Sequence, residues 1–388
     1  MLPVDLPGTV RDALLAPLVD HHCHGVRRDE LSRARFELLI SEGGGPAPPG
    51  TTHFDTPFGA AVRRWCAPLL DLEPHAPPAV YLARRAELGA GEVNRRLLAG
   101  AGVVAFLVDS SPEDAEMLSA AEMGRHGGAA ADELVRIEQI ERDVAETAQI
   151  AVDYLDTLGE ELAARAARAV GLKTVIGSLC GLDFDPARPA RGAVIAAANR
   201  RLADPKEPLT DPVLLRYLLW SAVDVARERG LPVQFHSGFG GPAEFGGDVL
   251  GAEPHRADPA RLSVFVRALQ PLGVPVILLH CYPFHRQAAH LAGLFPHVYV
   301  DVGLALPHLA ASARVMDELL ELAPFHKQLF SSGCRGVAES GYLGALHYRQ
   351  ALAAALRTRL ATGEWSAPDA ARVAHMIGSG NARRIYRL

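Results

Sequence analysis

Eight short runs of apolar and β-branched residues, separated by longer segments of helical period, constrain the fold of this 388-residue chain more than any other feature. The eight predicted strands cover residues 17–24, 103–109, 134–140, 173–178, 232–236, 276–281, 298–302 and 328–332. The predicted helices cover residues 79–98, 141–170, 213–229, 261–272, 311–322 and 338–361. Strands that alternate with helices pair in parallel, so eight such units predict an α/β fold of the closed (β/α)8 TIM-barrel type. An open doubly wound sheet is the alternative.

The chain is longer than the roughly 250 residues of a typical barrel, and we expect long strand-to-helix loops to hold the surplus. Residues 1–388 are predicted to form a single barrel domain, with loop insertions at 41–60 and 238–259. The second insertion is rich in glycine and follows the fifth predicted strand, at the end of the barrel where such enzymes carry their chemistry. It is a candidate lid, and a plain solvated loop is the alternative.

Composition narrows the classes of partner. The chain has 39 basic and 45 acidic side chains and a net charge of −6, so it offers no basic stripe to a nucleic acid. No segment approaches the ~20 apolar residues of a membrane span, and residues 1–16 lack the apolar block of a signal peptide. Five cysteines without a C-x-x-C pair predict reduced thiols. We therefore expect a cytoplasmic protein that acts on a small molecule, without membrane or nucleic-acid partners.

Histidines at the ends of predicted strands suggest a metal site. In the segment 20–24 (DHHCH), His22 and His24 are alternate residues of a strand and share a face. His236 and His280 end two further apolar runs, so all four side chains would project from one rim of the barrel. Neutral imidazole is a good ligand for zinc, manganese, iron or nickel. The alternative is that each histidine only satisfies local polar groups.

With these residues in place, the chain resembles the amidohydrolase superfamily of the amidohydrolase 2 type. More narrowly, it is similar to the nodulin-like part of glutamine-synthetase fusion proteins and to enzymes that hydrolyse γ-glutamyl amides. The segments that carry the resemblance are 19–25 (VDHHCHG), 231–238 (LPVQFHSG), 278–286 (LLHCYPFHR), 298–307 (VYVDVGLALP), 329–345 and 380–386 (GNARRIY).

The resemblance implies roles for particular residues. His22, His24 and His236 would hold one divalent metal, zinc being the first expectation, and His280 would bind the metal or polarise a substrate carbonyl. A metal held by imidazoles with one open position lowers the pKa of its bound water towards ~7. The residues just beyond His280, namely Tyr282, His285 and Arg286, are candidates for gripping a substrate carboxylate or carbonyl.

The chain departs from the resembled family at two places. The eighth strand of that family ends in an aspartate that binds the metal and moves the proton, but Gly333 stands here, so the expected general base is missing. On the fourth strand, Ser178 and Leu179 replace an aromatic residue and an arginine, which leaves Ser178 as a polar candidate for substrate contact.

Few residues could replace the missing aspartate. Asp301, which is predicted to face the barrel axis, and Glu339, which follows the eighth strand, are candidate bases beside His280; Glu138 and Cys334 are further candidates. A carboxylated Lys173 would also be a metal ligand, but the predicted strand places it at the wrong end of the barrel.

The sequence thus leaves three functional hypotheses. The first is a metal-dependent hydrolase that acts on an amide or a γ-glutamyl-type C–N bond of a small molecule. The second is a lyase, decarboxylase, cyclase or condensing enzyme of specialised metabolism, with an altered or absent metal site. The third is a non-catalytic relative that binds a ligand or a partner. By analogy with the resembled family, we expect a homodimer.

Overall fold

A computed structural model describes residues 3–41, 45–110, 115–238, 254–301, 303 and 313–388 of the chain. Its centre is a curled parallel sheet of seven strands in which each strand pairs with the next along the chain. The strands are β1 (Leu18–His24), β2 (Val103–Asp109), β3 (Ala130–Arg136), β4 (Gly171–Thr174), β5 (Val233–Ser237), β6 (Val276–His280) and β7 (Val298–Val300). Because all pairs are parallel, the carboxyl ends of the strands share one rim.

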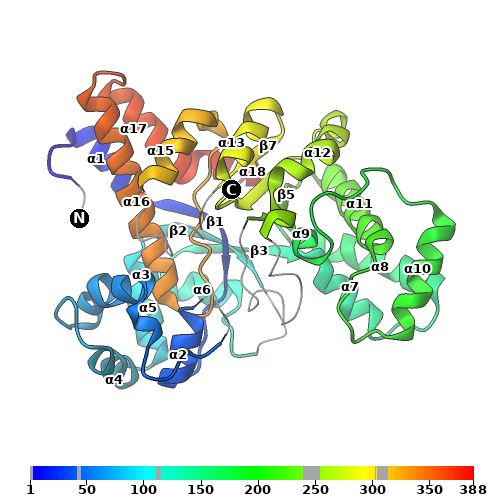
Figure 1. Ribbon diagram of the computed structural model, residues 1–388, viewed down its shortest axis with the longest axis horizontal. Coiled ribbons are helices and arrows are strands. Elements are labelled where there is room, and N and C mark those ends of the chain that lie inside the picture. Colours follow the sequence, from blue (N-terminus) through cyan, green and yellow to red (C-terminus); the bar gives the residue numbers. More distant parts are fainter. Residues whose placement is uncertain (1–2, 42–44, 111–114, 239–253, 302, 304–312) are drawn as a thin grey trace.

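Helices surround this sheet (Figure 1). They are α1 (Gly8–Leu15), α2 (Arg33–Leu39), α3 (Pro57–Ala61), α4 (Pro78–Leu88), α5 (Ala90–Gly100), α6 (Ala120–Gly127), α7 (Ile137–Ala145), α8 (Ala151–Ala166), α9 (Ile176–Leu179), α10 (Arg191–Ala203), α11 (Pro212–Arg229), α12 (Ser263–Leu269), α13 (His285–Leu294), α15 (Ala313–Leu322), α16 (Ala338–Ala361), α17 (Ala367–His375) and α18 (Asn381–Tyr386). Figure 1 places α7, α8, α10 and α11 together at one end of the molecule. An α/β architecture of strands alternating with helices confirms the predicted class.

Local chemistry explains the clearest elements. β6 is buried along its whole length because a strand of a parallel sheet covered by helices has no solvent face, which is why it reads as the continuous run VILLH. α11 begins where the Asp211 carboxylate accepts from the backbone N–H groups of Val213 and Leu214, with Pro212 in the first turn. The helix stops at Gly230, whose φ of +67° is accessible to glycine at little cost.

Two predicted strands lie elsewhere than expected. The third was expected at 134–140, but β3 ends at Arg136, and Ile137, Ile140 and Val144 form the buried face of α7. The apolar spacing of three and four residues there belongs to a helix. The fourth was expected at 173–178, but β4 ends at Thr174 and α9 begins at Ile176. The predicted helices 79–98 and 141–170 are each divided into two, α4 with α5 and α7 with α8.

The eighth predicted strand, 328–332, is not a regular strand. It makes an isolated parallel bridge between Val300 and Gln328. Its backbone bonds both edges of the sheet: Leu329 N–H donates to Val300 O at 3.0 Å, and Phe330 O accepts from His21 N–H at 3.3 Å. Further along, Gly333 N–H donates to His22 O at 3.2 Å. The segment therefore runs between β7 and β1.

The predicted insertions are only partly described. Within 41–60, residues 42–44 lie outside the described residues, and the rest includes a 3₁₀ turn at His53–Asp55 and the start of α3. Within 238–259, residues 239–253 lie outside them, and so does the predicted lid. In the part of the chain that is described, no helix is long and apolar enough to cross a membrane.

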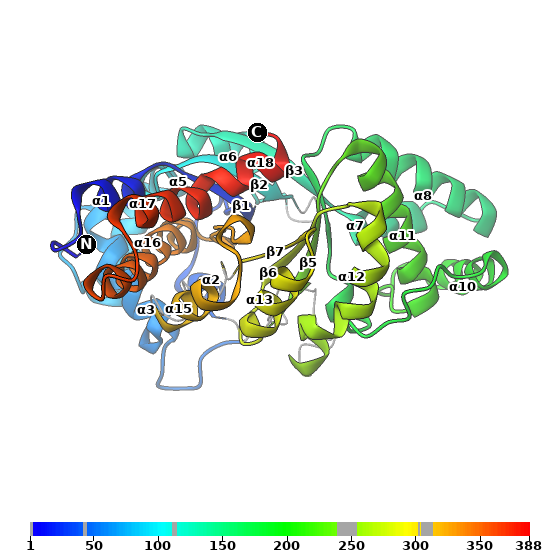
Figure 2. The ribbon, with the colours of Figure 1, turned by 90° about the horizontal axis from the view of Figure 1, so that it is seen from above.

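The interior of the curled sheet is filled by a separate apolar cluster. It contains side chains of β1, β2, β3 and β6 together with Leu329 and three residues of α18, namely Ala382, Ile385 and Tyr386. Figure 2 shows α18 beside β2 and β3. The last helix of the chain therefore packs against the inside of the sheet, below the rim where the strands end.

Candidate active site

Four histidines meet near the carboxyl ends of three strands. His22 and His24 lie on β1, His236 lies on β5 and His280 ends β6. The ring centroids are 5.0 Å apart for His22 and His24, 5.3 Å for His22 and His280, and 4.9 Å for His236 and His280. None of the four residues is more than 6% exposed. The structure thus brings together all four predicted metal ligands in one buried cluster, which we call the histidine cluster.

A register irregularity in β1 turns a fifth histidine inward. The pairing of β1 with β2 shifts between Asp20 and Cys23, as it does at a β-bulge. His21 Nδ1 lies 3.1 Å from the Tyr386 hydroxyl, and the Nδ1 of its neighbour His22 lies 3.0 Å from Gln234 Oε1. Strict alternation would have sent these two rings to opposite faces, so sequence reasoning missed His21.

A buried cation and carboxylate stand beside the cluster. Lys173 Nζ donates to His22 Nε2 at 3.3 Å and lies 2.7 Å from Asp109 Oδ2, with both side chains of the ion pair fully buried. Arg136 Nη2 donates to the same Asp109 oxygen at 2.5 Å, and His24 Nδ1 lies 3.6 Å from it. The expectation that Lys173 stands at the wrong end of the barrel is wrong, because β4 ends one residue after it.

Burial and these charges set the protonation of the site. Burial lowers the pKa of His22 and of His24 well below the usual 6.5, and the nearby Lys173 ammonium lowers both further. Burial raises the pKa of Asp109, but Arg136 and Lys173 outweigh burial and hold that pKa below its usual range. At neutral pH the site therefore combines the neutral imidazoles of His22 and His24, the form that binds metals, with the ionised carboxylate of Asp109.

Asp301 faces the interior, as predicted, but it contacts His21 and backbone groups. Its Oδ2 lies 2.5 Å from His21 Nε2 and accepts from Ser331 Oγ at 3.0 Å. Its Oδ1 accepts from the backbone N–H of His280 at 2.8 Å. Burial raises the pKa of Asp301, but the hydrogen bond from His21, together with that from the backbone N–H of His280, lowers the pKa by more, so the net shift is downward.

Glu339 lies in a second network. It forms a buried ion pair with Arg85, Nε to Oε1 at 2.9 Å, and accepts from the Tyr81 hydroxyl at 2.8 Å. These contacts fasten the start of α16 to α4. Of the other candidate bases, Glu138 Oε1 accepts from Val175 N–H at 3.0 Å, and burial raises the pKa of the Cys334 thiol to about 12.

The four predicted substrate-binding residues lie outside the histidine cluster. The Tyr282 ring stacks on His285 with centroids 5.9 Å apart, and His285 Nε2 lies 2.6 Å from Glu318 Oε2. The Arg286 guanidinium lies 3.5 Å from the other oxygen of Glu318. Ser178 lies in α9 and donates its backbone N–H to Val175 O. The contacts of His285 and Arg286 with Glu318 join α13 to α15.

Gly333 adopts a φ of +59°, in the left-handed region. Next to it, the backbone N–H and hydroxyl of Ser332 both donate to the carboxylate of Asp20, at 2.8 and 2.5 Å. Burial raises the pKa of Asp20 to about 6, although the hydrogen bonds from Ser332 lower it. These bonds tie the eighth segment to β1 just below the histidine cluster.

The cluster has the donor chemistry of a divalent metal site, with up to four imidazoles on neighbouring strands. The side chains of the cluster do not surround a common point at metal-ligand distances. Among the residues that the structure describes, no group of three or more His, Cys, Asp or Glu side chains is arranged so that it could hold a metal ion. Lys173 Nζ instead faces the Nε2 atom of His22. The residue types therefore fit a metal, while side-chain rotations would be needed to gather their nitrogens around one.

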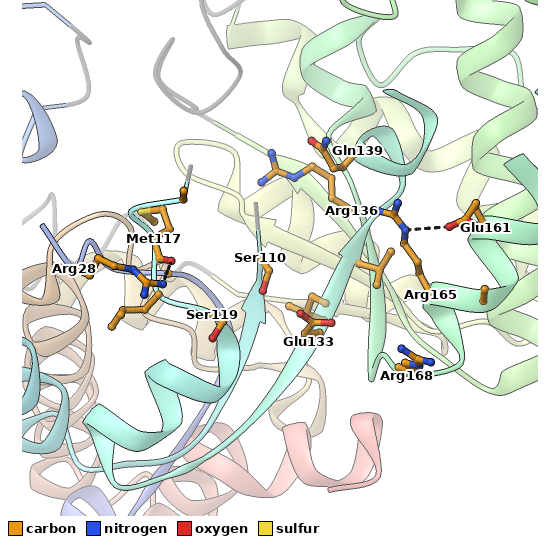
Figure 3. Close-up of a pocket in the computed structure, with 16 residues that line it drawn as sticks. Arg28, Ser110, Met117, Ser119, Glu133, Arg136, Gln139, Glu161, Arg165 and Arg168 are labelled. Atoms are coloured by element: carbon orange, nitrogen blue, oxygen red, sulfur yellow. Dashed lines mark hydrogen bonds and ion pairs between the residues drawn. The ribbon is translucent and has the colours of Figure 1, made fainter. Parts of the chain in front are cut away.

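A cavity of about 650 Å³ opens beside β3 (Figure 3). Gly25 and Ser110, which directly follow β1 and β2, line it together with residues of β3 and α8. Its charged lining consists of four arginines and two glutamates: Arg28, Arg136, Arg165, Arg168, Glu133 and Glu161. Because Arg136 also holds Asp109, this cavity borders the charged network of the histidine cluster. Its size suits a small molecule.

Comparison with known proteins places this geometry in context. Residues 19–388 match the family model described as amidohydrolase. Protein fluG of Emericella nidulans is 27% identical over 231 residues, which make up 56% of this chain but only 26% of that protein. The chain thus matches about a quarter of the length of that relative.

Two solved structures show the same fold. A Lactobacillus casei protein assigned as a metal-dependent hydrolase superposes with a TM-score of 0.82 at 22% identity and covers 98% of both chains. A uronate isomerase of Thermotoga maritima superposes with a TM-score of 0.65 at 12% identity and covers 97% of both chains. Because the family model spans residues 19–388, which include all four clustered histidines, this protein belongs to the amidohydrolase family.

Proposed function

We propose that the protein is a metal-dependent hydrolase that cleaves an amide or γ-glutamyl-type C–N bond of a small carbonyl compound. The observation that carries the proposal is the buried cluster of four histidines near the carboxyl ends of β1, β5 and β6. His22, His24 and His236 are the proposed metal ligands. A divalent metal bound there would act as a Lewis acid and generate hydroxide from water near neutral pH.

The residues around the cluster have distinct proposed roles. His280 takes the proton from the attacking water and passes it to the leaving nitrogen. It thereby performs the role of the aspartate that the resembled family carries at the position of Gly333. Asp301 positions His280 through the backbone N–H and does not touch the substrate. The Lys173 ammonium, held by Asp109, stabilises negative charge that develops on the substrate oxygen. Arg136 and the other arginines of the cavity support a substrate that carries a carboxylate.

Two finer structural features belong to this proposal. Residues 328–334 take the place of the eighth strand and close a (β/α)8 barrel. The backbone hydrogen bonds from Leu329 to Val300 and from His21 to Phe330 support this closure. The active unit is a homodimer that takes a small-molecule substrate.

Metal content tests the proposal directly. We expect about one equivalent of metal per chain, by plasma mass spectrometry, in protein purified without chelator, and almost none in the double variant His22→Ala/His24→Ala. His290→Ala, an exposed histidine of α13, is the matched control and should keep the metal. Absence of metal after reconstitution with zinc, manganese, iron and nickel would overturn the proposal. So would full turnover of an amide substrate by the double variant.

A non-hydrolytic reaction is the second candidate, and Gly333 favours it because the residue offers no proton acceptor. The same fold occurs in a uronate isomerase, so the fold itself does not require hydrolysis. Gly333→Asp separates the two candidates, since aspartate is among the residues that best tolerate a positive φ. A large gain in turnover of the native substrate would indicate a hydrolase impaired by glycine. No gain, with the fold intact, would favour a lyase, cyclase or isomerase.

A further inference from the structure

We propose that Gln234 and Tyr386 are positioning residues that fix the imidazole tautomers of His22 and His21, so that His22 presents the lone pair of Nε2 to the histidine cluster. Nothing in the resemblance or the comparisons assigns either residue a role. The proposal concerns the site of the proposed function and deepens it. The tautomer itself follows from hydrogen bonds alone.

The argument starts at a backbone carbonyl. Gln234 Nε2 lies 2.9 Å from the carbonyl oxygen of His21. A carbonyl oxygen only accepts, so the side-chain atom next to it must be the NH₂ group of the glutamine. The reversed amide would place two oxygens in contact in a buried site. The orientation of the Gln234 amide is therefore set by its hydrogen-bond partner.

The fixed amide decides the state of His22. With its nitrogen on the carbonyl, Gln234 directs Oε1 at His22 Nδ1, 3.0 Å away. Oε1 only accepts, so Nδ1 of His22 must carry the hydrogen. On the opposite edge of the ring, the Lys173 ammonium faces Nε2 at 3.3 Å. Because an ammonium only donates, Nε2 must carry the lone pair. Both edges of the ring require the same neutral tautomer.

The other branch reaches His21 through the last helix. Gln234 Nε2 also lies 2.7 Å from the Tyr386 hydroxyl, which accepts that bond and can donate its own hydrogen to His21 Nδ1 at 3.1 Å. The far nitrogen of His21, Nε2, then donates to Asp301 Oδ2 at 2.5 Å. A carboxylate requires a donor there, so Asp301 independently requires a hydrogen on Nε2 of His21. Every group in the chain has a partner of the correct kind.

Burial makes these bonds effective. Gln234 and His21 are fully buried, and Tyr386 is packed in the interior apolar cluster. Water cannot replace a lost bond in such a site, so removal of one partner leaves a buried polar atom unsatisfied. The hydrogen-bond partners of metal-binding histidines orient the ring and typically change metal affinity by about 10- to 100-fold when they are removed. Gln234 therefore bonds His22 directly, whereas Tyr386 is linked to His22 only through its hydrogen bond with Gln234.

Nitrogen NMR of metal-free protein labelled with ¹⁵N in the histidine rings tests the proposal without turnover. His22, assigned by the signals lost in His22→Ala, should show a protonated Nδ1 and an unprotonated Nε2. In Gln234→Leu the contact with Lys173 alone still favours this tautomer, so the protonated Nδ1 form should lose population without vanishing. Tyr386→Phe, the matched variant, leaves the bond between Gln234 and the carbonyl in place, so it should change the shifts of His21 and leave the tautomer of His22 unchanged.

The wild-type spectrum is decisive even if a variant does not fold. Protonation of His22 at Nε2, or at both nitrogens near neutral pH, would overturn the proposal. An unchanged His22 tautomer in folded Gln234→Leu would also overturn it.

Zinc affinity, measured by competition with a chelator, separates this proposal from the proposed function. We expect Gln234→Leu to weaken zinc binding by about 10- to 100-fold, and Tyr386→Phe to weaken it far less. Zinc binding by wild type that Gln234→Leu leaves unchanged would overturn the positioning role while the metal site stands. Absence of zinc binding in wild type would overturn the proposed function, and the NMR result would still decide the tautomer.

Discussion

Asp109 accepts two cations at one oxygen, from Lys173 at 2.7 Å and from Arg136 at 2.5 Å. Lys173→Met should lower the free energy of unfolding by about 3 kcal/mol, because removing one partner of a buried ion pair leaves a charge poorly compensated. The value is at the lower end of the usual range because Arg136 stays in place. Urea unfolding measures this loss. Lys206→Met, at an exposed lysine, is the matched control, and equal losses in both variants would contradict the prediction.

The residues of the site differ in how well the sequence predicted their positions. The four histidines of the cluster were predictable because a polar residue that ends an apolar strand stands out. Gln234 shares the strand parity of His236 and could have been found by the same rule. Lys173 was misplaced because the predicted strand extended four residues too far. His21 required knowledge of the β1 irregularity, which depends on how β1 pairs with β2 and leaves no local signal.

At the scale of elements, the strand boundaries that were predicted wrongly share one cause. β3 begins with Ala130 and Ala131 and contains the exposed Glu133, so it lacks the apolar run that marked the other strands. The stronger apolar pattern nearby belongs to α7. The eighth segment keeps the backbone hydrogen bonds of a strand at its two ends but not a continuous ladder. Such features depend on which strands pair and which helices cover them in the folded chain, and the periodicity of apolar residues in the sequence does not contain this information.

One side chain of the last helix holds the backbone at the start of the eighth segment. Asn381 Nδ2 donates to Phe325 O and to Gln328 O, both at 2.8 Å. Asn381→Ala should lower the free energy of unfolding by about 1–3 kcal/mol, because the buried carbonyl of Gln328 and the partly buried carbonyl of Phe325 both lose the hydrogen bond from Asn381. Asn199→Ala in α10 is the control, since the Asn199 side chain is exposed and donates to Ile195 O of its own helix. Equal unfolding midpoints for the two variants would count against the support role.

At the scale of the whole molecule, the alternation of strands and helices predicted the α/β class and the parallel sheet, because each unit buries its apolar side against the same sheet. The positions of the loops in space were harder to predict from the sequence. The arginine-lined cavity is lined by residues of β3 and α8 and by segments that follow β1 and β2, so its residues are scattered in sequence. Chemistry at the rim depends on such assemblies, whereas the fold depends on local patterns repeated along the chain.

Metal binding should appear as a stability change of the whole fold. β1, β5 and β6 all contribute to the histidine cluster, so a ligand that joins them binds only the folded chain. At a free metal concentration 100 times the Kd, the free energy of unfolding should rise by about 2.7 kcal/mol. Thermal unfolding with and without metal measures the shift, and a chelator should reverse it. The double variant His22→Ala/His24→Ala should show no shift; if it is stabilised as much as wild type, the metal binds elsewhere.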